Sequence, residues 1–327
     1  MILAGIDEAG YGPMLGPLVV SVAVFRLPDG DPPADLWEAL APAVDRSAKS
    51  RAIPVNDSKK LFQQGKGLAN LEEGILPFLF SREGSYPGTL RSLLQAVARR
   101  GAGNGEDYLD SYPWYRGRDV KLPRDTFQAV VRRLAGRLDE RLKASSVEFL
   151  GLAAIPVEVR EFNEQLTTID NKSRLSFRVI GDFLRRLWKQ YGGERTEVVV
   201  DRQGGRTHYA PLLFETLRPR GIHIDEQRPE RSTYRLTRSA KRNQETEFRI
   251  MFSTECEEKF LPVALASMLS KYLRELHMHL FNEYFSERQQ GLKPTAGYVT
   301  DARRFLADTV ELRRRLSIDE ALLIRRK

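Results

Sequence analysis

The chain of 327 residues contains a single cysteine, four histidines and no long run of apolar side chains. The one cysteine, Cys256, cannot form an intramolecular disulfide, which suits a reducing compartment. A helix that spans a bilayer needs about 20 apolar residues in a row, so a membrane-embedded protein is excluded. Residues 1–8 carry two acids where an export signal needs basic and then apolar residues, and we therefore expect a cytoplasmic protein.

Charge is abundant and unevenly balanced. Lysine and arginine number 52 against 44 aspartates and glutamates, which gives a net charge of +8. Such a surplus attracts polyanions and binds them by releasing their counterions, so nucleic acid is the leading partner. The alternative interpretation of this charge is that an arginine-rich composition reflects a genomic bias, with the arginines on solvated surfaces and no nucleic-acid partner implied.

Apolar residues recur with the periods of both strands and helices. Short apolar or β-branched runs at 2–7 and 18–25, joined by a Gly/Pro-rich segment, predict a hairpin, and 147–154 predicts another strand. A helical period covers 171–190, and the run 197–201 is a buried-type strand that ends at Asp201. A long helix is expected over 261–278. Strands and helices in this order favour an α/β architecture.

The other segments show no sustained period. We expect a core formed by 1–61 and 144–300, with insertions at 62–143 and 228–252 and a basic helical segment at 301–327. The second insertion contains the cationic residues Arg238, Lys241 and Arg242. The first contains Tyr108, Tyr112, Trp114 and Tyr115, which are suited either to stacking on bases or to covering the core.

Several acids occur at positions that suit metal chemistry. Asp7 and Glu8 end an apolar run and are followed by Gly10-Tyr11-Gly12, whose glycines permit a sharp turn and a close approach of the backbone to a ligand. Asp201 ends a strand, where open α/β sheets place functional groups. Glu275 shares a helix face with Ser267 and Lys271. Taken singly, each of these is also typical of a turn, a helix cap or a solvated charge.

The order of the motifs resembles the ribonuclease HII family. The matching blocks are Asp7-Glu8-Ala9-Gly10-Tyr11-Gly12-Pro13, Asn56-Asp57-Ser58-Lys59-Lys60-Leu61, Val198-Val199-Val200-Asp201, residues 264–275 and Gly297-Tyr298-Val299-Thr300. The resemblance covers about two thirds of the chain. It implies a ribonuclease H-like core, a mixed sheet flanked by helices.

The resemblance also implies the site residues. The family's four metal-binding carboxylates correspond to Asp7, Glu8, Asp201 and Glu275, the last being a glutamate as in the ribonuclease HIII branch, where HII has aspartate. Glu257 corresponds to an auxiliary acid. The residues that correspond to substrate contacts are Gly10, Tyr11, Gly12, Asn56, Ser58, Lys59, Lys259, Lys271 and Tyr298. Tyr11 replaces the usual arginine of the glycine motif, so a phosphate contact made by that arginine is lost. His277 and His279 are expected to be ordinary helix residues.

The implied activity is endonucleolytic hydrolysis of the RNA strand of RNA/DNA hybrids, or of ribonucleotides embedded in duplex DNA. The family uses two divalent ions, Mg²⁺ or Mn²⁺, and leaves 5′-phosphate and 3′-hydroxyl ends. We expect a monomer with no membrane association. Two alternatives remain open: a nucleic-acid-binding protein on the same core that has lost catalysis, and a metal-dependent nuclease for branched DNA.

Overall fold

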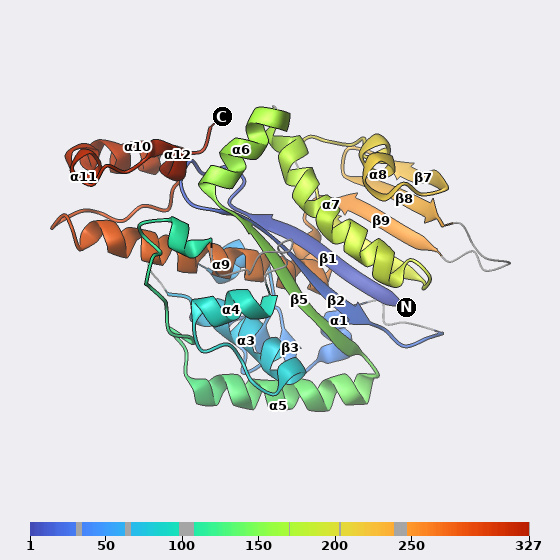
Figure 1. Cartoon of the computed structure of the whole chain (residues 1–327). Helices are drawn as coiled ribbons and strands as arrows, with labels where there is room; N and C mark the ends of the chain where they lie inside the picture. The colour runs from blue at the N-terminus through green and yellow to red at the C-terminus, as the bar shows by residue number, and fades with distance from the viewer. Residues whose placement is uncertain are drawn as a thin grey trace.

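A seven-stranded sheet forms the centre of the protein (Figure 1). The computed structural model describes residues 1–30, 35–62, 67–97, 108–169, 171–202, 204–238 and 247–326. The strand order is β5-β2-β1-β6-β9-β8-β7. The strands are β1 (Ile2–Ala9), β2 (Leu18–Arg26), β5 (Glu148–Val157), β6 (Thr196–Asp201), β7 (Gly221–Gln227), β8 (Arg231–Thr237) and β9 (Phe248–Ser253). A separate two-stranded ladder joins β3 (Val44–Asp45) to β4 (Ile53–Pro54).

The sheet is mixed. Strand β1 pairs antiparallel with β2, as the predicted hairpin requires, and parallel with β6, which in turn pairs parallel with β9. The other neighbours in the sheet are antiparallel. The predicted α/β class, a mixed sheet flanked by helices, is confirmed.

Helices cover both faces of the sheet because side chains alternate along each strand. Ile2, Ala4 and Ile6 of β1 belong to the core cluster under α6 (Val159–Ile169), α7 (Lys172–Tyr191) and α8 (Ala210–Leu217). Residues 3, 5 and 7 face α9 (Leu261–Ser286), which lies behind the sheet in Figure 1. That face also carries α1 (Leu36–Leu40), α2 (Ser58–Leu61), α3 (Ala69–Glu83), α4 (Leu90–Val97) and α5 (Gln128–Ser145).

The two helices predicted from periodicity are present. Helix α7 follows the prediction for 171–190 closely and is capped by the Asn171 side chain, which accepts from the Arg174 N–H. Helix α9 continues eight residues beyond the predicted end at residue 278, to Ser286. None of the helices within the described residues is long and apolar enough to cross a membrane.

The prediction of an insertion at 228–252 is wrong for the part of this segment that the structure describes. The segment supplies β8 and most of β9, and β9 lies between β6 and β8 inside the sheet. Arginines within both strands, such as Arg231 of β8 and Arg249 of β9, conceal the strand pattern. Lys241 and Arg242 lie outside the described residues.

Residues 62–143 contribute α3, α4, the 3-10 turn η1 (Leu109–Ser111) and α5 to the same core as α9. Tyr112, Trp114 and Tyr115 are buried, and Trp114 packs edge-on against Phe281 of α9. The segment 301–327 forms short helices, α10 (Val299–Asp308), α11 (Val310–Arg315) and α12 (Glu320–Leu323), at the end of the molecule that also carries α6 (Figure 1).

Candidate metal centre

Asp7 and Asp201 lie side by side where the parallel ladder between β1 and β6 ends. The register pairs Ile6 of β1 with Val200 of β6, so the next residue of each strand is an aspartate. Both side chains point to the face covered by α9, because Val199, two residues before Asp201, packs against Val263 of that helix.

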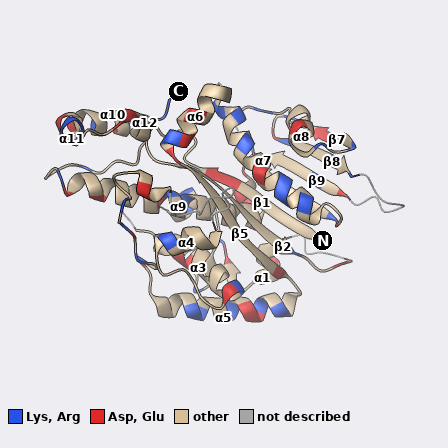
Figure 2. Ribbon diagram, in the orientation of Figure 1, with Lys and Arg blue, Asp and Glu red and all other residues tan. Residues whose placement is uncertain are grey.

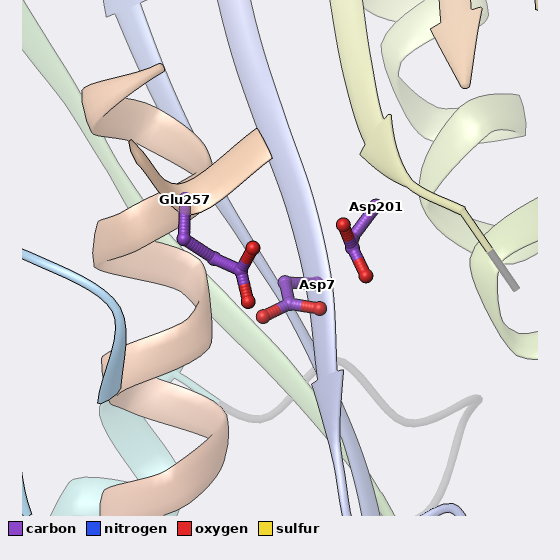
Figure 3. A group of neighbouring side chains, drawn as sticks. All are labelled: Asp7, Asp201 and Glu257. Carbon is purple, nitrogen blue, oxygen red and sulfur yellow. The ribbon is translucent and has the colours of Figure 1, made fainter. Parts of the chain in front are cut away.

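Glu257 joins them from the 3-10 turn η2 (Cys256–Glu258), which connects β9 to α9. One carboxylate oxygen from each of the three residues lies within 4.8 Å of the other two. Figure 3 shows the three carboxylates pointing toward one another from separate elements. Asp7 and Glu257 are buried, with 4% and 7% of their surfaces exposed.

Gly5 permits this convergence. A Cβ atom at this position would lie 2.2 Å from the backbone nitrogen of Val263. The first turn of α9 therefore packs directly against the backbone of β1, and this close contact brings η2 and Glu257 up to the strand ends.

Serines of α9 hold Asp7 in place. The Ser267 hydroxyl bonds to the Asp7 carboxylate and lies 3.1 Å from the hydroxyl of Ser58. Ser270 donates to the Asp7 backbone carbonyl at 3.1 Å and to Ser21 at 2.8 Å. The carboxylate is thus fixed by packed helix residues, an arrangement suited to a preorganised site.

The cluster carries more negative charge than its surroundings stabilise. Burial, followed by the charges of Asp201, Glu8 and Glu257, raises the pKa of Asp7 well above its ordinary value. Burial and then Glu257 raise the pKa of Asp201 to about 7, although backbone N–H groups of Cys256 and Arg202 oppose this shift. A bound cation would relieve the repulsion and lower these pKa values.

Glu8 follows Asp7 on β1 and lies within electrostatic range of the cluster. Burial, followed by the charges of Asp201 and Glu257, raises the pKa of Glu8 to about 8, and Lys59 opposes the shift. Its Oε2 atom is buried and has no hydrogen-bond partner among the described residues. An unpaired buried carboxylate oxygen beside three converging carboxylates is the donor set that hard cations such as Mg²⁺ and Mn²⁺ prefer.

A cavity of about 200 Å³ opens beside the cluster, and Lys59, Asp201 and Glu257 are among the residues that line it. Lys59 lies in α2, which is capped by Asp57 through the Lys59 N–H at 2.8 Å. The pKa of the Lys59 ammonium is raised. Burial has the largest single effect and lowers this pKa, but it is outweighed by the charges of Asp57, Glu257, Asp7 and Asp201. The ammonium is therefore a cation at the mouth of an acidic cavity.

The structure corrects the assignment of Glu275. Its Oε1 accepts a hydrogen bond from Lys271 Nζ at 2.7 Å, and that ammonium lies 4.5 Å from the centre of the Phe62 ring. Eight residues of helix separate Glu275 from Ser267, a distance of ~12 Å along the axis. Glu275 is not among the carboxylates that converge with Asp7 and Asp201; Glu257 takes that place.

The glycine motif forms a tight loop after β1. Gly10 has a φ of +86°, and a Cβ there would lie 2.5 Å from the Pro17 carbonyl oxygen, so the position requires glycine. A Cβ at Gly12 would meet nothing within 4 Å, which leaves that part of the loop open. Tyr11 packs partly against the core. Burial, followed by the charge of Glu8, raises the pKa of its hydroxyl group, and Arg206 opposes the shift.

Tyr298 lies beside this loop at the start of α10. The backbone N–H of Met14 donates to the Gly297 carbonyl at 2.8 Å, which joins the Gly297-Tyr298 block to the loop. Just over half of the Tyr298 surface is exposed, at 52%, so its ring is accessible to a ligand.

The remaining predicted contact residues have different environments. The side chain of Asn56 donates to the Arg46 carbonyl at 2.9 Å and shapes its own loop. Ser58 is buried against Ser267, and Lys271 is held by Glu275. Lys259, at the end of η2, is exposed. Within the described residues, then, Gly12, Lys59, Lys259 and Tyr298 are the exposed members of the predicted contact set.

Comparison with known proteins gives a structural likeness at low identity. No family model matches the chain, and no curated protein matches it. Similar solved structures include ribonuclease HII of Archaeoglobus fulgidus in its complex with PCNA, at 14% identity and a TM-score of 0.43, covering 100% of this chain and 95% of that one. Ribonuclease H2 of Pyrococcus horikoshii has 15% identity and a TM-score of 0.44, over 99% and 92% of the two chains.

A ribonuclease HIII described as a complex with Mn²⁺ is also similar, at 12% identity and a TM-score of 0.42, with 99% of this chain and 66% of that chain covered. At these identities and TM-scores the likeness says nothing about activity. The residues of the site carry the functional interpretation.

Proposed function

We propose that this protein is a metal-dependent endonuclease of the ribonuclease H type, which hydrolyses the RNA strand of RNA/DNA hybrids or ribonucleotides embedded in duplex DNA. The observation that carries the proposal is the convergence of Asp7, Asp201 and Glu257 within 4.8 Å, at a strand, β1, that leads directly into the glycine loop. Asp7, Asp201, the glycine loop and Tyr298 belong to sequence blocks that resemble ribonuclease HII, and Glu257 corresponds to an auxiliary acid of that family.

Asp7, Asp201 and Glu257 would hold Mg²⁺ or Mn²⁺, with Glu8 as a further oxygen donor. When bound in such a site, a pair of divalent ions activates water and stabilises the leaving oxygen of a phosphodiester. The Ser267 hydroxyl keeps the Asp7 carboxylate oriented, and Lys59 attracts the phosphate to the cavity. The expected products have 5′-phosphate and 3′-hydroxyl ends.

Selectivity for RNA requires a contact to the 2′-hydroxyl group, because that group distinguishes the two sugars at a given position. The open backbone at Gly12 and the exposed ring of Tyr298 are the contacts we propose. The net charge of +8 would hold the duplex through its phosphates without sequence preference. We also propose that the protein acts as a monomer in the cytoplasm.

The test uses three labelled duplexes that contain one ribonucleotide, a run of ribonucleotides, or none. We expect cleavage with Mg²⁺ or Mn²⁺ only where RNA is present, and no cleavage by Asp7→Asn or Asp201→Asn protein. Binding of all three duplexes without cleavage by the wild-type protein would instead support a protein that has lost catalysis.

The branched-DNA alternative depends on the aromatic residues of 62–143. Tyr112, Trp114 and Tyr115 are each at most 3% exposed and pack in the core, so these side chains cannot stack on bases. Of the four aromatic residues that favoured this alternative, then, Tyr108 alone is partly exposed.

A further inference from the structure

Two buried arginines donate hydrogen bonds to backbone carbonyl groups of the glycine loop, residues 10–17. Arg325, just after α12, donates through Nη1 to the Gly10 carbonyl and through Nη2 to the Gly16 carbonyl, both at 2.5 Å, and its backbone N–H donates to Met14 at 2.9 Å. Arg274 of α9 donates to the carbonyls of Pro17 at 2.8 Å, Leu15 at 3.2 Å and Ala296 at 2.9 Å. Arg325 is 3% exposed and Arg274 is 1% exposed.

Burying two guanidinium groups together is costly, and the surroundings offset only part of the cost. Burial, followed by the charge of Arg274, lowers the pKa of Arg325 to about 9, and Glu158 opposes the shift. The Arg325 guanidinium also lies 4.9 Å from the centre of the Phe162 ring. Most of the hydrogen bonds that the two guanidinium groups donate are accepted by carbonyl groups of the loop. The loop therefore holds the guanidinium groups in place, and they in turn hold the loop.

The hydrogen bond from Arg325 to the Gly10 carbonyl also determines the direction of the next backbone N–H group, that of Tyr11. In a trans peptide the C=O of one residue and the N–H of the next point in opposite directions. Since the Gly10 carbonyl points inward to buried Arg325, the Tyr11 N–H points away from it. The outer side of the loop is open, because a Cβ atom on Gly12 would meet no other atom within 4 Å.

We propose that Arg325 is a positioning residue for sugar recognition: by holding the Gly10 carbonyl, it aims the Tyr11 backbone N–H at an oxygen of the substrate ribose. The proposal rests on the proposed function, because it concerns the same site. The guanidinium fork matters as well as the charge, because a lysine ammonium has no planar pair of donors to hold both carbonyls in this geometry.

The experiment measures the ratio of dissociation constants for an all-DNA duplex and a duplex with one ribonucleotide, without divalent metal so that neither is cut. We expect Arg325→Lys to lower this ratio by about fivefold, the effect of losing one hydrogen bond. Mn²⁺ affinity, measured by calorimetry, should stay within twofold of wild type. Arg326→Lys, at the exposed neighbouring position, is the matched control and should leave the ratio unchanged.

An unchanged ratio in folded Arg325→Lys protein would overturn the proposal, as would a wild-type ratio of one. If Arg325→Lys does not fold, Phe162→Leu removes the ring beneath the guanidinium and keeps the arginine; it should lower the ratio by a smaller factor, and no change would again overturn the proposal. Wild-type protein that cleaves no duplex would reject the proposed function, while the binding ratio would still decide the role of Arg325.

Discussion

Glu257 and Glu275 have the same chemistry but different neighbours. Glu257 converges with Asp7 and Asp201, whereas Glu275 forms an ion pair with Lys271. We therefore expect Glu257→Gln to lower kcat/KM by at least about 100-fold and to weaken Mn²⁺ binding, because it removes a ligand. Glu275→Gln should leave Mn²⁺ affinity nearly unchanged. Steady-state kinetics and metal titration of this matched pair make the comparison, and the reverse ranking would restore Glu275 as the ligand.

The raised pKa values make stability depend on pH when no metal is bound. The pKa of Asp201 is raised to about 7 and that of Glu8 to about 8, so between their ordinary values and these values the folded state binds more protons than the unfolded state. The free energy of unfolding should therefore fall as pH rises from about 4 to 8 and level off above that.

We expect Tm in a chelating buffer to be at least about 3 °C lower at pH 8 than at pH 5, and millimolar Mn²⁺ to restore most of the loss at pH 8. Asp201→Asn should flatten the pH profile, because it removes one raised acid and the repulsion it exerts. Differential scanning calorimetry at both pH values measures this, and a wild-type profile that is flat without metal would contradict the expectation.

At the scale of elements, the contact between α9 and β1 aligns the site. Gly5→Ala places a methyl group 2.2 Å from the Val263 nitrogen, so the helix must move. We expect a loss of about 1–3 kcal/mol in the free energy of unfolding and a disproportionate loss of kcat.

The control for this substitution is Gly136→Ala in α5, where a Cβ meets nothing within 4 Å. It should raise stability by about 0.5–1 kcal/mol, because alanine favours a helix interior. Urea unfolding of both variants gives the free energies, and equal effects would mean that α9 does not depend on the contact at Gly5.

Glu72 of α3 anchors the segment that leads into α5. This fully buried carboxylate accepts from the backbone N–H groups of Arg124, Asp125 and Thr126 and from the Tyr272 hydroxyl at 3.0 Å. Glu72→Ala leaves these donors unpaired and should cost about 3 kcal/mol. Glu83→Ala, which removes an exposed ion pair, should change stability by less than about 1 kcal/mol in the same urea titration. Similar losses in both would show that the Glu72 contacts contribute little.

Much of the core could be predicted from the sequence because its apolar periods are local. Helix α7 and strands β1, β2 and β6 show these periods directly, and the strand-ending acids Asp7 and Asp201 follow from them. Strand β9 could not be predicted in this way because Arg249 interrupts its apolar run. Glu257 could not be ranked above Glu275 because its position depends on the packing of α9 against Gly5, a tertiary contact that no local pattern encodes. The signals for Glu257 in the sequence are its correspondence to an auxiliary acid and its place just before a long helix.

At the scale of the whole molecule, the net charge of +8 bears on the proposed binding of nucleic acid. Figure 2 shows lysine and arginine along α7 and α5, on opposite sides of the sheet. Arg178, Arg186 and Lys189 of α7 are exposed. We expect duplex affinity to fall by at least about 10-fold between roughly 50 and 200 mM salt, similarly for hybrid and DNA duplexes. Fluorescence anisotropy measures both series, and an affinity independent of salt would exclude phosphate contacts as the main source of binding.

The carboxylates of the candidate centre come from positions 7, 201 and 257 of the chain. A ribosome must therefore add 250 residues after Asp7 before Glu257 joins the chain, and β1 must wait for β6 to form its parallel ladder. During that interval the nascent chain carries basic segments but no assembled cation site. Under the proposed function, synthesis would thus separate the binding of nucleic acid from its cleavage, and a chain that terminated before Glu257 would lack one of the three converging carboxylates.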